Sequence, residues 1–390
     1  MLNRRTASQL SGAATLANMA AGPWAPAAAQ AGPAPAGLIV HRAQPLNAEP
    51  PLARLRAAFI TPQRDFYIRS HGTIPRLARD SYKLRIGGVG AVPTELTLDE
   101  LQSRFPRRTV TAVLQCAGNR RADMLTVKPV PGDPWGPGAI SNAEWGGVSL
   151  GDVLRAAGVK EGQALHVAFD SHDEIEEEGE RFRFGVSIPL AKAMAPETLL
   201  AFTMNGEPLT AEHGFPVRIV TPGYAGVRSP KWLAAITVQD RPSDNHIQQK
   251  EYKLFPPDAT KATADMSKGL VVNGMPLNSA ICEPAVEAKL PTGATTVRGY
   301  AIATARAVVR VYMSGDGGAT WRQAELERHD GAPWSWTFWT ASLDLPAGRH
   351  ELIVRAWDDA SETQPGATAD VWNYPGYLSA AWHRVPVLVG

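Results

Sequence analysis

The sequence predicts an α+β domain followed by an all-β immunoglobulin-like sandwich. Between residues 38 and 258, β-branched runs such as 164–169 and 217–221 alternate with segments that begin like helices. Between residues 259 and 390, short alternating strands are separated by turn-rich stretches. Mixed elements followed by strands alone are typical of this pair of domains. A chain of 390 residues with 44% hydrophobic content can bury two cores.

Candidate helix N-caps, an acidic run and a linker segment can be recognised in the first region. Thr97 and Ser149 each precede a helix-like segment and are candidate N-caps. The acidic run 173–178 is interpreted as a solvated loop. The proline-containing segment 252–258 is interpreted as a linker, which places a domain boundary after residue 258.

In the second region, residues 308–313 and 322–326 flank the turn-rich segment 314–319, which predicts a hairpin. Two further alternating runs, 334–339 and 351–357, predict additional strands of the sandwich.

Charge and cysteine content exclude several functions. The 39 basic and 38 acidic side chains nearly cancel, so the composition favours neither nucleic acid nor an anionic membrane as a partner. Since no run of about twenty apolar residues occurs, we expect no membrane span. The absence of a Cys-x-x-Cys-His motif means that this chain attaches no c-type haem. Cys282 is expected to be a buried, unpaired residue.

The first 31 residues have a composition unlike that of the rest of the chain. Arg4 and Arg5 precede a weakly apolar Ala/Leu/Gly stretch and then small residues at 27–31. This order is typical of a signal peptide, and the paired arginines indicate the twin-arginine route to the periplasm. A disordered Ala/Pro-rich tail is the alternative interpretation.

One cysteine, Cys116, lies in surroundings that favour a reactive thiol. The β-branched run 109–115 predicts a buried strand that ends at Cys116, and Arg120 and Arg121 follow within five residues. Nearby cations favour the thiolate form, which binds metals or acts as a nucleophile, and guanidinium groups bind oxyanions. The alternative is a structural cysteine before a loop with two surface arginines.

The segment LQCAGNRR at 114–121 resembles the cysteine loop of the sulfite oxidase family of molybdenum enzymes. Other segments resemble this family in the same order along the chain: FYIRSH (66–71), WGPGAIS (135–141), AEWGGV (143–148), HGFPVR (213–218), RSPKWL (228–233), WN (372–373) and WHRV (382–385). The resemblance extends from about residue 55 to the C-terminus.

The resemblance implies a molybdenum ion held by molybdopterin, with Cys116 as the only protein ligand of the metal. It assigns substrate or catalytic roles to Arg69, Arg121, Trp135 and Tyr252. It assigns cofactor binding to Tyr67, Ile68, Arg69, Ser70, His71, Asp170, His213, Arg218, Ser229, Pro230 and Lys231. Without the resemblance, Arg69 would be a salt-bridge partner, His71 and Trp135 core residues, and Tyr252 part of the linker.

The implied function is the oxidation of sulfite to sulfate by oxygen-atom transfer. Because this chain has no haem, the electrons must pass to an external acceptor, for which a c-type cytochrome is expected. The resemblance also implies a homodimer joined through residues 259–390.

One departure weakens the substrate prediction. Family members carry a further substrate arginine where Pro375 stands in this chain. The alternative is therefore a molybdenum oxidoreductase for another oxyanion or an S- or N-oxide, such as nitrate. A non-catalytic exported binding protein is the third hypothesis.

Overall fold

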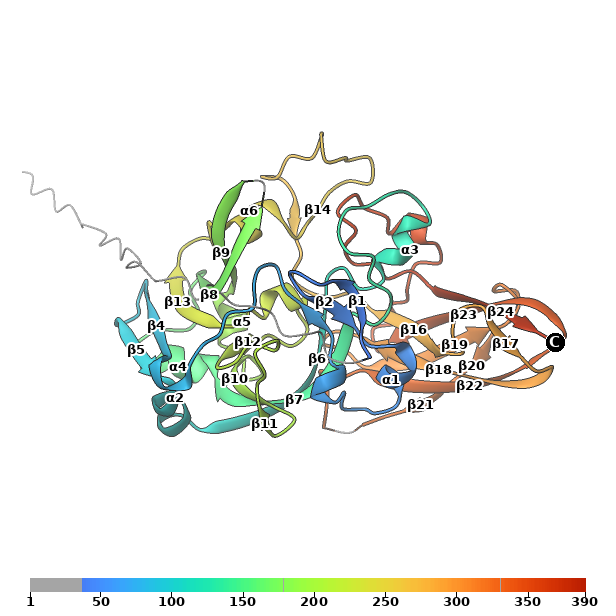
Figure 1. Cartoon of the computed structure of the whole chain (residues 1–390), viewed down its shortest axis with the longest axis horizontal. Helices are drawn as coiled ribbons and strands as arrows, with labels where there is room; N and C mark the ends of the chain where they lie inside the picture. The colour runs from blue at the N-terminus through green and yellow to red at the C-terminus, as the bar shows by residue number, and fades with distance from the viewer. Residues whose placement is uncertain (1–36, 178, 330) are drawn as a thin grey trace, which may run out of the picture.

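The computed structural model describes residues 37–177, 179–329 and 331–390. A mixed region of strands and short helices lies beside an elongated region of strands that ends at the C-terminus (Figure 1). The predicted signal peptide lies outside the described residues. The order of an α+β region and then a β-rich region confirms the predicted fold class.

Two sheets and a small three-stranded sheet build the first region. The strands are β1 (Ile39–Arg42), β2 (Asn47–Glu49), β3 (Ile68–Arg69), β4 (Lys83–Gly88), β5 (Thr94–Thr97), β6 (Arg107–Gln115), β7 (Ile140–Ser149), β8 (His166–Glu177), β9 (Glu180–Pro189), β10 (Leu199–Met204), β11 (Glu207–Pro208), β12 (Arg218–Val220) and β13 (Leu233–Gln239). The orders are β1-β2-β3, β5-β4-β13-β8-β9 and β11-β10-β7-β6, and β12 also pairs with β10. Only β13 and β4 run parallel among the pairs of these sheets.

The helices of the first region are short, and capping fixes where two of them begin. They are α1 (Leu52–Arg56), α2 (Leu98–Arg104), α3 (Arg121–Leu125), α4 (Leu150–Ala156), α5 (Leu190–Ala193) and α6 (His246–Lys250). Thr97 and Glu100 form a reciprocal capping box at α2. The Ser149 hydroxyl accepts the Asp152 amide at the start of α4. Both predicted N-caps are confirmed.

The second region is a two-sheet sandwich. Its strands are β16 (Asn278–Glu283), β17 (Ala288–Leu290), β18 (Gly293–Ile302), β19 (Val308–Ser314), β20 (Arg322–Gln323), β21 (Glu325–Glu327), β22 (Thr337–Leu345), β23 (Gly348–Asp358) and β24 (His383–Val389). The sheets β16-β18-β22-β21 and β17-β24-β23-β19-β20 enclose a core of residues such as Val297, Val311 and Leu352. Inward-facing residues alternate with exposed ones along the strands, as expected for this packing.

The predicted hairpin at 308–326 is only partly correct. β19 pairs with β20 over two residue pairs, but residues 325–327 leave that sheet and form β21 against β22 of the opposite sheet. A strand that changes sheets in this way cannot be recognised from alternation alone, because both sheets bury the same kind of residue.

The two regions share buried contacts and a short bridging sheet. β14 (Lys253–Leu254) pairs with β15 (Leu270–Val271) across the segment predicted as a linker. Leu55 and Ile140 of the first region pack with Tyr300 and Trp336 of the second. Among the described residues, no helix has the length and apolar character needed to cross a membrane.

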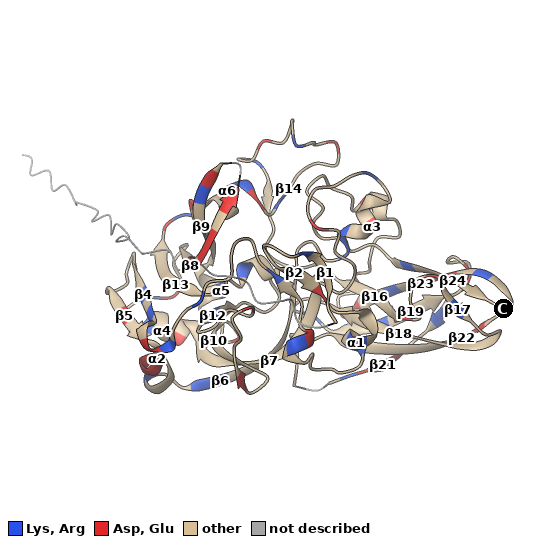
Figure 2. Cartoon of the chain, in the orientation of Figure 1, with Lys and Arg blue, Asp and Glu red and all other residues tan. Residues whose placement is uncertain are grey.

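The acidic run 173–178 was expected to be a solvated loop, and this prediction is wrong for its described part. Residues 173–177 belong to β8, which pairs with β9 as far as Glu177 and Glu180. The cross-strand pairs Glu174 with Arg183 and Glu176 with Arg181 place opposite charges face to face. Acidic and basic residues are accordingly visible along the upper parts of β8 and β9 (Figure 2).

Candidate active site

The strand β6 carries Cys116 into the interior of the molecule. β6 is exposed at its start and buried from Ala112 onward. After it ends, the Cys116 amide donates to the Ala139 carbonyl at 2.9 Å, and the Cys116 carbonyl accepts the Asn119 amide at 3.0 Å. The Gly118 amide points at the sulfur, 3.4 Å from Sγ. Cys116 is therefore a buried, unpaired thiol in a rigid turn.

Glycine at position 118 leaves room for the Arg121 side chain beside the turn. A Cβ there would lie 2.6 Å from Nη2 of Arg121, closer than nonbonded atoms approach. Arg120, two residues later, has a left-handed backbone with φ of 64°. Gly118 thus lets the Arg121 guanidinium lie against the cysteine loop.

Cys116 opens into a cleft that is lined by both polar and apolar side chains. Of the predicted site residues, those that line it are Tyr67, Arg69, Ser70, His71, Cys116, His213, Arg218, Ser229, Pro230, Lys231 and Tyr252. These residues come from segments that are far apart in the sequence, from Tyr67 to Tyr252. The cleft therefore unites most of the residues that the family motifs selected.

Cations gather on one wall of the cleft. Lys231 donates to Ser70 Oγ at 3.2 Å and to the Glu212 carbonyl at 2.7 Å. Arg218 donates to the carbonyls of His213 and Ser229 at 3.0 and 3.1 Å. Burial, together with the Arg218 charge, lowers the pKa of Lys231 to about 7. An anion bound here would stabilise both cations, so the wall is suited to a phosphate group.

His213 stands on the same wall as a neutral residue. Its Nε2 lies 3.0 Å from the Gln63 carbonyl, and its ring meets Phe66 edge to face. Burial and the charges of Lys231 and Arg218 lower the pKa of His213 to about 3. It can therefore hydrogen-bond a ligand without adding charge.

Tyr252 and His71 form another part of the cleft lining. Tyr252 Oη and His71 Nε2 are 2.6 Å apart, and the Tyr252 ring stacks on Tyr377 at 4.9 Å. Burial raises the pKa of Tyr252 well above its usual value. Burial and the charges of Arg69 and Lys231 lower the pKa of His71 well below its usual value. Both groups are thus neutral, and they share a hydrogen bond at the cleft wall.

The structure places Asp173, rather than the predicted Asp170, in the cleft. Asp170 is exposed and does not line the cleft. Asp173 lines it with 3% exposure, and its Oδ1 has no hydrogen-bond partner. Burial raises the pKa of Asp173 to about 7. The β8–β9 register shifts between Asp170 and Glu174, and this bulge is the feature that the sequence did not reveal.

Three other predicted residues do not line the cleft. Ile68 points away from it into a cluster with Leu46 and Ala48, because successive strand residues face opposite sides. Trp135 is fully buried among the residues that also pack around Cys116, 4.9 Å from the His41 ring. Arg121 donates to the carbonyls of Asp133 and Gly376, each at 3.0 Å. Trp135 and Arg121 thus support the cysteine loop from behind in this structure.

Several lining residues carried no sequence signal of their own. Phe184 and Glu212 line the cleft beside the predicted residues. Glu212 directly precedes the motif at 213–218, so its position could have been inferred from that motif. Phe184 lies on β9 and reaches the cleft only because β9 pairs with β8.

The donor set defines what the cleft can hold. It offers one soft sulfur ligand, the cations Arg69, Arg218 and Lys231, and a buried carboxylate with an unpartnered oxygen. Thiolate sulfur suits a soft or polarizable metal, cations suit a phosphate, and the carboxylate suits N–H donors. A metal–pterin group with a phosphate tail has all three features and therefore fits these residues.

Two family models and several known proteins match this chain. Residues 71–247 match the oxidoreductase molybdopterin binding domain, and residues 270–390 match the Mo-co oxidoreductase dimerisation domain. The sulfite oxidase of Gallus gallus is 43% identical over 357 residues, which are 89% of this chain and 77% of that protein. The mitochondrial sulfite oxidase of Homo sapiens is also 43% identical, and the chain spans 66% of its length.

A solved structure shows the same architecture. The sulfane dehydrogenase SoxCD from Paracoccus pantotrophus superposes with a TM-score of 0.74 at 26% identity, covering 88% of this chain and 84% of that one. The matched domain and relatives imply the Mo-molybdopterin cofactor, and the donor set of the cleft fits this group. On these grounds the chain belongs to the sulfite oxidase family of molybdopterin-dependent oxidoreductases.

Proposed function

We propose that this oxidoreductase converts sulfite to sulfate and passes the electrons to an external acceptor. The observation that carries the proposal is that Cys116, Arg69 and Tyr252 line one cleft. That cleft lies in a chain that is 43% identical to a sulfite oxidase.

The residues around the cleft have separable tasks in this reaction. When bound, Mo-molybdopterin supplies oxygen-atom transfer and takes up two electrons. Cys116 would hold the metal, while Lys231 and Arg218 would bind the pterin phosphate. Asp173 would accept hydrogen bonds from the pterin ring through its free Oδ1.

Arg69 and Tyr252 would act on the substrate. Arg69 would pair with the sulfite anion, which is stabilised strongly where surrounding side chains exclude water. Tyr252 would keep its proton on Oη and orient it through the bond to His71. The Arg121 charge would act from behind the cysteine loop, since its N–H groups face the Asp133 and Gly376 carbonyls.

The direct test is a steady-state assay of the holoenzyme with sulfite and oxidised cytochrome c. We expect turnover by the parent protein and none by Cys116→Ser, because a hard oxygen replaces the soft sulfur ligand. Molybdenum and pterin content and circular dichroism check that the variant is folded and loaded. Near-parental activity of a loaded Cys116→Ser variant would contradict the metal-ligand assignment.

The alternative substrate follows from Pro375, which stands where family members carry an arginine. A cleft with one cation fewer favours a less highly charged oxyanion, such as nitrate. Nitrate with a reduced dye therefore serves as the second assay. Faster turnover of nitrate than of sulfite would replace the proposed substrate.

The proposal also covers the location of the protein, its electron acceptor and its oligomeric state. The Arg4-Arg5 leader supports periplasmic location, and fractionation with N-terminal sequencing tests it. A c-type cytochrome is the proposed acceptor, and the similarity to sulfite oxidase and to the sulfane dehydrogenase SoxCD supports it. The match at 270–390 supports a homodimer, which light scattering at micromolar concentration would detect as twice the chain mass.

A further inference from the structure

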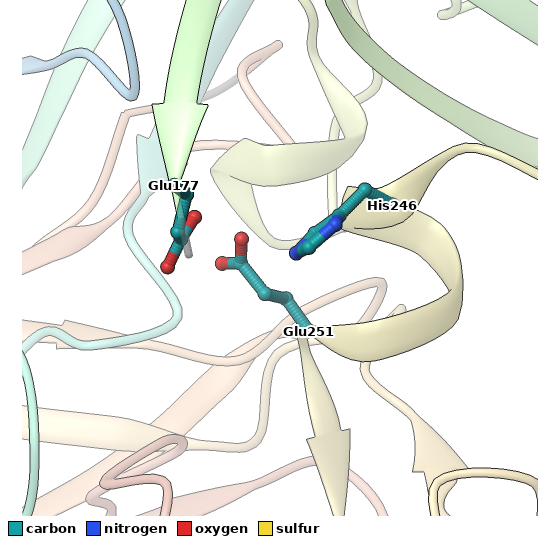
Figure 3. A group of neighbouring side chains, drawn as sticks. All are labelled: Glu177, His246 and Glu251. Atoms are coloured by element: carbon teal, nitrogen blue, oxygen red, sulfur yellow. The ribbon is translucent and has the colours of Figure 1, made fainter. Parts of the chain in front are cut away.

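Three potential metal ligands converge beside the β8–β9 hairpin. Glu177 ends β8, His246 begins α6, and Glu251 directly follows α6. One ligand atom of each lies within 4.8 Å of the others. Their side chains point toward a common space between the strand and the short helix (Figure 3).

The His246 ring is held in a fixed orientation. Its side chain is only 8% exposed and stacks on Phe182, with ring centroids 4.4 Å apart and an interplanar angle of 11°. Nδ1 lies 3.2 Å from Glu180 Oε2, while Nε2 has no hydrogen bond among the described residues. Figure 3 shows the outer ring nitrogen directed toward the Glu251 carboxylate. A carboxylate on one ring nitrogen and a metal on the other is the usual arrangement of a metal-binding histidine.

The cluster around His246 is rich in carboxylates. Glu177 and Glu251 lie close to the ring, Glu180 contacts its Nδ1, and Lys250 lies 3.3 Å from Glu180. A cation bound between the Glu177 and Glu251 carboxylates would be attracted by both of them. Glu177 is exposed, so an ion can enter from solvent.

We propose that Glu177, His246 and Glu251 bind a divalent metal ion of the zinc class. Zinc bonds of about 2.0–2.2 Å place tetrahedral ligands about 3.4 Å apart, so the three groups need to close by about 1.4 Å at most. Rotation of the Glu177 and Glu251 side chains supplies such a movement. One imidazole and two carboxylates suit Zn²⁺, whereas Ca²⁺ prefers six or more oxygen ligands.

The site has a structural consequence for the cleft. Glu251 is bonded to Tyr252, the residue that contacts His71 and Tyr377. An ion shared by Glu177 and Glu251 would fasten the end of β8 to the chain segment that carries Tyr252 into the cleft. Zinc binding should therefore raise the temperature at which this segment unfolds.

The experiment uses the molybdenum-loaded protein, so that Cys116 cannot capture the added ion. After dialysis against a weak chelator, with molybdenum content unchanged, Zn²⁺ is titrated by calorimetry and Co²⁺ is followed by its visible spectrum. We expect one ion per chain and a tetrahedral Co²⁺ spectrum. Glu177→Gln and Glu251→Gln should each weaken Zn²⁺ binding more than about tenfold.

Glu176→Gln is the matched control, since Glu176 is the neighbour of Glu177 and pairs with Arg181 at 3.6 Å instead of the cluster. It should bind Zn²⁺ like the parent protein. Glu177 is exposed, so its variant should fold even if His246 or Glu251 variants do not. Failure of the parent to bind Zn²⁺, equal binding by Glu177→Gln, or binding of Ca²⁺ in preference to Zn²⁺ would overturn the proposal.

Discussion

At the residue scale, Arg69 shows how a local pattern sets the chemistry of the cleft. It follows Ile68 on the two-residue strand β3, so the two side chains face opposite sides. Ile68 enters the hydrophobic cluster around Ala48, while Arg69 lines the cleft with Cys116. Arg69, which belongs to the motif at 66–71, therefore lies in the cleft where the oxyanion is expected to bind.

Replacing Arg69 by Gln should raise the Michaelis constant for sulfite and lower kcat. Losing one charge-assisted contact in a shielded cleft costs about 1.5–3 kcal/mol, which is roughly tenfold to a hundredfold in kcat/KM. Arg64→Gln is the control, because Arg64 is largely exposed and pairs with Asp65 at 3.7 Å rather than with a residue of the cleft. Unchanged constants for Arg69→Gln would show that the anion binds elsewhere.

Asp173→Asn should reduce the retention of molybdopterin, because Asp173 offers a buried, unpartnered oxygen to the cleft. We expect about a tenfold loss of affinity, since removing a charged partner leaves the ligand's N–H donors with a weaker acceptor. Pterin content after gel filtration measures the effect. Asp170→Asn, on the exposed side of β8, should retain the parental content.

The segment around Pro375 contacts residues that surround Cys116. Gly376 accepts a hydrogen bond from Arg121 through its carbonyl, and Tyr377 stacks on Tyr252 and lies 5.4 Å from the Arg121 guanidinium. This segment thus contributes an aromatic ring and a carbonyl to the surroundings of Cys116. Arg121 and Tyr252 are both held in place by it.

At the element scale, helix α2 depends on its N-cap. The Thr97 hydroxyl accepts the Glu100 amide at 3.2 Å, and the Glu100 carboxylate accepts the Thr97 amide at 2.8 Å. The cap orients Leu98 and Leu101, which are buried in the main core. A short helix of seven residues has little stability of its own, so the cap and this packing hold it.

Thr97→Ala should lower the free energy of unfolding by about 1 kcal/mol, because it removes the cap. Urea denaturation of the cofactor-free protein measures the change. Ser103→Ala in the same helix removes only a bond to the Asp99 carbonyl and should leave stability unchanged or slightly higher. Equal losses in both variants would mean that the cap does not stabilise α2.

At the scale of the whole molecule, buried neutral histidines make the fold sensitive to acid. His383 begins β24, and its Nδ1 accepts the Ile281 amide at 3.1 Å, joining the two sheets of the sandwich. Burial and the Arg120 charge lower the pKa of His383 to about 4. The unfolded chain therefore binds a proton near pH 6.5, where the folded chain does not.

This difference predicts that stability falls as the pH drops from 6.5 to 4. The loss from His383 is at most about 3.5 kcal/mol, since each unit of pKa difference corresponds to about 1.4 kcal/mol. His383→Asn keeps an acceptor for the Ile281 amide but cannot be protonated, so its stability should depend less on pH in this window. Urea denaturation at a series of pH values tests this, and identical slopes for both proteins would contradict it.

The sequence by itself determined the features that depend on neighbouring residues. The strand that leads to Cys116, the caps Thr97 and Ser149, and the order of the two regions follow from local patterns of β-branched, capping and turn residues. The family motifs also selected most residues of the cleft, because each motif is a short continuous segment.

Only the tertiary structure decided which side chains meet across long separations. A bulge in the β8–β9 pairing exchanged Asp170 for Asp173, and strand pairing converted the acidic run into part of a hairpin. Packing of α6 against β9 brought Glu177 to His246 and Glu251. These outcomes depend on strand register, and a slip of one residue reverses the side to which every side chain points. Register is fixed by the sum of many distant contacts, so no local pattern specifies it.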